Sequence, residues 1–199
     1  IMSVNNSVSK STWFIFLIGV IAIAITRNIP HPANFSPVLS VALFSGAYFR
    51  KNWMAFLLPL GAMLVSDAVF EITEKHAGFY PGFQWDFLCF MLVVLMGFRL
   101  RNSKSALIVV GYSVAASVLF FVVSNLATWL FSPLYTMDFS GLVTCFVNAI
   151  PFYGHDSIGG ALFIGQTNFF ANTIWSTIIF SGVLFGAAYL LNKKYSLSV

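Results

Sequence analysis

The chain has 199 residues, of which 59% are hydrophobic and 8% charged, with a formal net charge of +4. This composition is typical of a polytopic membrane protein, and the length leaves room for a single membrane domain over residues 1–199. The basic residues flank apolar runs and form no patch, so we expect no nucleic-acid partner.

Six apolar runs follow one another along the chain, and each predicts a transmembrane helix. The six runs cover approximately residues 13–26, 37–49, 53–72, 85–100, 105–131 and 169–191. The second is short, because a straight span needs about 20 residues. A further apolar segment, residues 139–152, is too short and too interrupted to span, which predicts an interfacial or re-entrant segment.

The basic residues predict the orientation of these helices. Most of them stand at alternate ends of the six runs: Lys10, Arg50, Lys51, Arg99, Arg101, Lys104, Lys193 and Lys194. Because short cytoplasmic loops carry an excess of Lys and Arg, this pattern predicts both termini in the cytoplasm. The loops at 27–37, 73–84 and 132–168 then lie outside, and their length suggests that any ligand is captured from that side.

One acidic residue, Asp67, lies within the third apolar run. A carboxylate at this depth costs about 2.5–3.5 kcal/mol on insertion scales unless it faces protein or water. We therefore expect Asp67 to face the interior, within reach of the polar patch of the fifth helix. Glu71 lies one turn further on, so the two carboxylates either bind a cation or share a proton, or Glu71 lies in water and only Asp67 is buried.

Polar and aromatic residues gather near the outer end of the fifth helix. Asn125 has two donors and an acceptor, so it can hold two helices together, bond Asp67 or bond a ligand. Trp129 and Tyr135 flank this patch, whereas Trp85 starts its run and is interpreted as an interface anchor. The predicted binding residues are Asn34, Asp67, Asn125, Trp129, Tyr135 and Asn148.

No sequence motif indicates catalysis or a cofactor. The chain has no HExxH, GxSxG or P-loop pattern, so we expect no enzyme activity. Cys89 and Cys145 form no metal-binding pattern and are interpreted as buried core residues. The three histidines have wide, unequal spacings, which favours solvated loop residues over a metal site.

Four stretches in order carry a family resemblance: NFSPVLSVALFSGAYF, PLGAMLVSDAVFE, SNLATWLFSPLY and GLVTCFVNAIPF. Together they resemble an uncharacterised bacterial family of small membrane proteins grouped with the substrate-binding S components of energy-coupling factor (ECF) vitamin transporters. The resemblance implies a six-helix fold in the bacterial inner membrane. It also implies a pocket that opens outward and is closed by the first, third and fifth connecting loops.

Two functions fit these observations. The first is a solute-binding transport subunit of the S-component type, in which Asp67 and Asn125 fix a polar part of a vitamin-like molecule and Trp129 and Tyr135 stack on its ring. Its partners would be the solute, the bilayer and a coupling module. The second is a structural accessory subunit of a larger membrane complex, in which the same polar residues only tie helices together.

Overall fold

The computed structural model describes residues 10–29, 31–49, 51–73, 78–79, 82–103, 105–150 and 168–195. This part of the chain contains seven α-helices and no strand: α1 (Lys10–Asn28), α2 (Val38–Tyr48), α3 (Asn52–Thr73), α4 (Phe83–Phe98), α5 (Ala106–Phe131), α6 (Phe139–Ala149) and α7 (Phe169–Tyr195). The all-helical fold class predicted from the sequence is therefore confirmed for the described residues.

Within the described residues, three helices are long and apolar enough to cross a membrane: α3, α5 and α7. This identifies the chain as a membrane protein. Helices α2, α4 and α6 are apolar but shorter, as is the part of α1 from Gly19 to Asn28. At about 1.5 Å per residue, α2 is only about 16 Å long, so it is much shorter than the hydrocarbon core of a bilayer.

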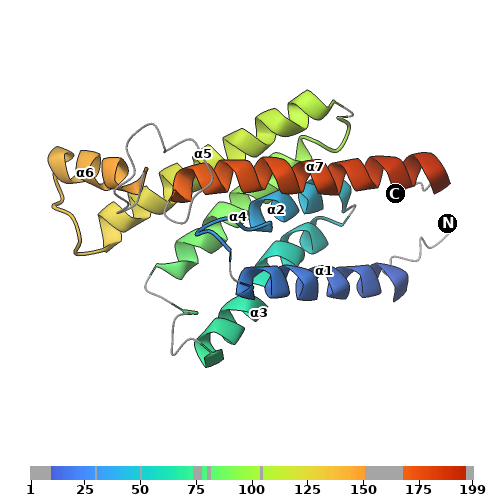
Figure 1. Ribbon diagram of the computed structural model, residues 1–199, viewed down its shortest axis with the longest axis horizontal. Coiled ribbons are helices and arrows are strands. Elements are labelled where there is room, and N and C mark those ends of the chain that lie inside the picture. The colour runs from blue at the N-terminus through green and yellow to red at the C-terminus, as the bar shows by residue number, and fades with distance from the viewer. Residues whose placement is uncertain are drawn as a thin grey trace, which may run out of the picture.

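Helix α2 is the centre of the bundle and packs against α3, α4, α5 and α7, whereas α1 packs against α3 (Figure 1). Eight of the 11 residues of α2 are buried. A helix that is apolar on all sides belongs inside protein, which explains why α2 shows no clear amphipathic pattern. Because protein and not lipid surrounds α2, this helix does not have to be as long as the hydrocarbon core is thick.

The closest helix contact joins α2 to α4. A Cβ atom added at Gly46 would overlap the carbonyl oxygen of Val94, and one added at Gly97 would overlap the carbonyl oxygen of Leu43. Small residues let two backbones approach in this way. Gly46 therefore serves packing within the chain, in contrast to Gly111, where an added Cβ would meet no atom within 4 Å.

The two ends of the bundle differ. The start of α1 and the end of α7 lie at one end, together with the α4–α5 connection (Figure 1). At that end Arg101 donates to the carbonyl oxygens of Gly46 and Phe49 and to Asn52 Oδ1, at 2.8–3.0 Å, and so closes the end of α2. The opposite end carries α6, the start of α4 and the start of α7 (Figure 1).

Candidate binding cavities at the end opposite the termini

Two adjoining cavities lie at the end of the bundle that carries α6. The larger has a volume of about 810 Å³ and the smaller about 350 Å³. Four residues line both: Asn34, Asp86, Phe120 and Thr173. They come from the loop before α2 and from α4, α5 and α7, so the cavities lie where these elements meet.

The loop before α2 is held in place by α7. Asn172 donates from Nδ2 to the carbonyl oxygen of Ala33 at 2.7 Å, and Ser176 donates to that of Asn34 at 3.5 Å. Asn34 itself adopts a φ of 59°, in the left-handed region that asparagine tolerates better than most residues. Its side-chain amide makes no hydrogen bond with any described residue, and Asn34 faces both cavities. Asn34 is thus a polar group presented to whatever fills them.

Asp67 is buried and pairs with Arg27. The Arg27 Nη1 donates to Asp67 Oδ1 at 2.7 Å, and the two side chains are 18% and 3% exposed, respectively. Arg27 Cζ also lies 5.7 Å from the ring centroid of Phe70. Arg27 lines the smaller cavity and Asp67 does not, so of the two paired side chains only the arginine contributes to the cavity wall.

This pairing changes one expectation from the sequence. Asp67 faces the interior as predicted, but its described partner is on α1 and not on the polar patch of α5. The expected bond between Asp67 and Asn125 is absent, because Asn125 donates from Nδ2 to the Phe121 carbonyl oxygen of its own helix at 2.7 Å. Glu71 accepts from the Phe79 backbone N–H at 3.3 Å, so it supports the segment that follows α3.

The polar patch of α5 lines the larger cavity through Ser124, Asn125 and Thr128. The Ser124 and Thr128 hydroxyls donate to carbonyl oxygens one turn back, at 2.7 and 3.0 Å. Each of these hydroxyls satisfies its donor within the helix and keeps acceptor capacity. This arrangement allows polar groups to face a cavity without an unpaired hydrogen.

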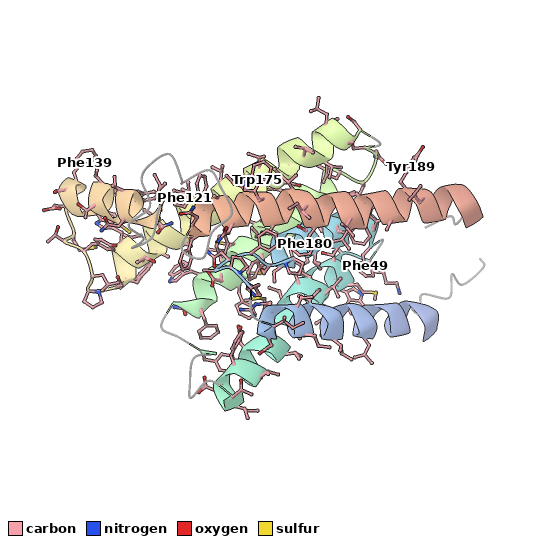
Figure 2. The ribbon with its side chains drawn as sticks, viewed as in Figure 1. Phe49, Phe121, Phe139, Trp175, Phe180 and Tyr189 are labelled. Atoms are coloured by element: carbon pink, nitrogen blue, oxygen red, sulfur yellow. The ribbon has the colours of Figure 1, made fainter. Side chains whose placement is uncertain are left out.

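Aromatic rings form much of the wall of the larger cavity. Trp85 stacks on Phe131 with centroids 4.7 Å apart and planes at 14°, and Phe121 packs against Phe170 with centroids 4.5 Å apart. Figure 2 shows Phe121 on α5 beside the start of α7. The Trp85 Nε1–H is buried and has no hydrogen-bond partner among the described residues. Buried donors are rarely left unpaired, so this indole N–H is an exception among the described residues.

Four predicted site residues do not line the two cavities: Asp67, Trp129, Tyr135 and Asn148. Trp129 donates from Nε1 to the Thr136 carbonyl oxygen at 2.9 Å, so it fastens the turn between α5 and α6. The aromatic pair that lines the larger cavity is Trp85 and Phe131, and the stacking role expected of Trp129 and Tyr135 stays a prediction. Asn34 and Asn125 are the predicted residues that do line the cavity.

Arg27, Trp85 and Asp86 line the cavities and are not among the residues predicted from the sequence. A signal for Arg27 was present, because a buried carboxylate needs a countercharge and Arg27 is a basic residue at the predicted outer side. Trp85 stands at the start of an apolar run, where an interface anchor and a cavity wall have the same sequence pattern.

Among the described residues, no group of three or more His, Cys, Asp or Glu side chains could hold a metal ion. His31 lines the smaller cavity, with Nδ1 2.8 Å from the Pro32 carbonyl oxygen. His76 and His155 lie outside the described residues. Cys89 and Cys145 are free and buried, as predicted.

Residues 7–198 match a family of unknown function, DUF6580. Because the match covers nearly the whole chain, this protein belongs to that family. No match was found among curated proteins or among solved structures.

Proposed function

We propose that this protein is a membrane subunit that binds a small solute in the two adjoining cavities, and that it is not an enzyme. The observation that carries the proposal is the pair of cavities itself. The larger, at about 810 Å³, lies within the range of about 300–1,000 Å³ that small-molecule sites occupy. Aromatic walls with a few polar groups are also the usual lining of such sites.

The proposed topology has six crossings, formed by α1, α2, α3, α4, α5 and α7, with both termini in the cytoplasm. The start of α1 and the end of α7 lie at the same end of the bundle, which supports an even number of crossings (Figure 1). Arg99 and Arg101 stand at that end too, as the preference of basic residues for the cytoplasm requires. The cavities then open toward the outside.

The shortness of α2 is compatible with a crossing. Non-helical backbone is tolerated at membrane depth only where it is buried in protein or lines a cavity. The loop from His31 to Pro37 meets this condition, because Asn34 and Ser36 line the cavities and Pro37 is buried. The loop and α2 together make one crossing, with the loop as its outer part.

The resemblance to ECF S components supports a transport role in the bacterial inner membrane, with a coupling module as the partner. In the structure the face of α1 that carries Gly19 packs against α3, since a Cβ added at Gly19 would lie 3.2 Å from Leu58 Cδ1. A coupling module would therefore meet the other face of α1. That face exposes Leu17, Ile21, Ile25 and Ile29 at four-residue spacing.

The experiment is to purify the protein in mild detergent and analyse it by native mass spectrometry. The proposal predicts a small molecule that stays bound and is released on unfolding. A large protein at fixed stoichiometry, with no small molecule at any stage, would instead support the accessory-subunit function.

A further inference from the structure

We infer that the smaller cavity holds an anionic group of the solute, a carboxylate or a phosphate, at Arg27. This inference rests on the proposed function and names the chemical class of the ligand. It starts from the orientation of the ion pair. Asp67 is 3% exposed and is not part of the cavity wall, whereas Arg27 is 18% exposed and lines the cavity, so the cavity meets the basic member of the pair.

Arg27 has donors to spare. A guanidinium carries five N–H groups in a rigid fork, and the described contacts of Arg27 use one nitrogen, Nη1. Its position is already fixed by the bond to Asp67 and by the ring of Phe70, whose centroid is 5.7 Å from Cζ. A planar donor group fixed in advance is suited to bind carboxylate or phosphate, because little side-chain entropy is lost on binding.

Two neighbouring residues, Asn34 and Ser36, can donate hydrogen bonds to an anion at this place, whereas His31 only contributes to the wall. His31 lines the same cavity, and its Nδ1 is 2.8 Å from the carbonyl oxygen of Pro32. Since a carbonyl only accepts, Nδ1 carries the hydrogen and the ring is held by that bond. Asn34 and Ser36 add an amide and a hydroxyl to the lining.

Asp86 is the acidic residue of the cavity lining. It lines both cavities and makes an interaction within the protein. A second negative charge would be repelled near Asp86, so the anion belongs at Arg27, and the ring system of the same solute belongs against Trp85 and Phe131 in the larger cavity. The ligand is then an elongated molecule with a flat ring at one end and an anionic group at the other.

The test uses four probes that share one ring: 1-naphthoate, 1-naphthyl phosphate, 1-naphthamide and 1-naphthylmethylamine. Binding to the purified protein in detergent is measured by isothermal titration calorimetry at low salt. We expect one of the two anions to bind at least about tenfold more tightly than the amide and the amine. The preferred anion distinguishes a carboxylate ligand from a phosphate ligand.

The variants distinguish an effect of the Arg27 charge on binding from an effect on folding. Arg27→Gln alone would leave Asp67 buried without a countercharge, so the main variant is Arg27→Gln with Asp67→Asn, which keeps a polar pair without charges. Arg99→Gln is the control, because Arg99 is exposed at the opposite end of the bundle. The double variant should lose the preference for the anion and keep the affinity for the amide, and the control should keep both.

Equal binding of anion and amide by the natural protein, or an anion preference that survives in the folded double variant, would overturn the inference and leave the proposed function standing. If none of the four probes binds and no solute is retained in purification, the proposed function fails together with the inference. If the double variant does not fold, Arg27→Lys decides: it keeps the charge but loses the fork, so the anion preference should fall and not vanish.

Discussion

The ion pair between α1 and α3 gives the sharpest prediction about stability. Asp67→Leu removes the carboxylate and leaves Arg27 at 18% exposure without its countercharge. Breaking a buried ion pair from one side costs about 3–5 kcal/mol, and the partial exposure of Arg27 favours the lower end, about 3 kcal/mol. Asp67→Asn keeps a hydrogen-bond acceptor for Arg27 and should therefore cost less.

The assay is thermal unfolding in detergent, followed by the intrinsic fluorescence of the tryptophans. For a chain of this size 1 kcal/mol corresponds to roughly 2–4 °C in Tm, so Asp67→Leu should lower the midpoint by about 6–12 °C. The single variants Arg27→Gln and Asp67→Asn, together with their double variant, form a cycle that isolates the coupling between the two residues.

The reasoning requires a clear coupling. Contacting residues show interaction energies of about 0.5–3 kcal/mol, whereas independent sites add within about 0.5 kcal/mol. Equal midpoints for the natural protein, Asp67→Leu and Asp67→Asn would refute the pairing. Strict additivity of the single changes would refute it as well, even if each change were destabilising.

Three further predictions concern packing, α6 and topology. Gly46→Ala should destabilise by about 1–3 kcal/mol through overpacking against α4, whereas Gly61→Ala, where an added Cβ meets no atom within 4 Å, should be neutral or better in the same unfolding assay. Hydrogen bonds from the Gly141 backbone N–H and the Thr136 hydroxyl lower the pKa of Asp138. The stabilisation that this cap gives α6 is therefore complete above the ordinary pKa of an aspartate and is lost as the pH falls through the lowered pKa. Amide protection at the start of α6, corrected for intrinsic exchange, should stay constant from about pH 5 to pH 8 and drop only in stronger acid. Single cysteines introduced at Leu134 and at Arg99, in a background without the two natural cysteines, should react with impermeant reagents from opposite sides of the membrane, and labelling of both from one side would contradict the six-crossing topology.

The helices could be predicted from the sequence because their signal is local. Each apolar run contains a helix in the structure, including the short one that became α2. The length of α2 is explained only by the fold, since it depends on the helices around it and on the loop from His31 to Pro37. An apolar run carries no information about whether protein or lipid will surround it.

The site could be predicted only in part, for a physical reason. Asn34 and Asn125, which were predicted as binding residues, line the cavities. Trp129 instead donates a hydrogen bond to the Thr136 carbonyl oxygen and stabilises the turn between α5 and α6. Trp85 lines the larger cavity instead, where its ring stacks on that of Phe131 from the next helix. Which aromatic ring reaches a cavity depends on the crossing of α4 and α5, and no pattern within one helix determines that crossing.

Blocking the larger cavity tests solute binding most directly. Thr128 lines this cavity, whereas Val122 lies on the same helix with 41% of its surface exposed. Thr128→Trp should fill the cavity and abolish the small molecule retained by the purified protein, as seen by native mass spectrometry. Val122→Trp adds the same ring outside the cavity and should retain the molecule at the level of the natural protein. The same retained molecule in all three proteins, at equal occupancy, would contradict the assignment of these cavities as the binding site.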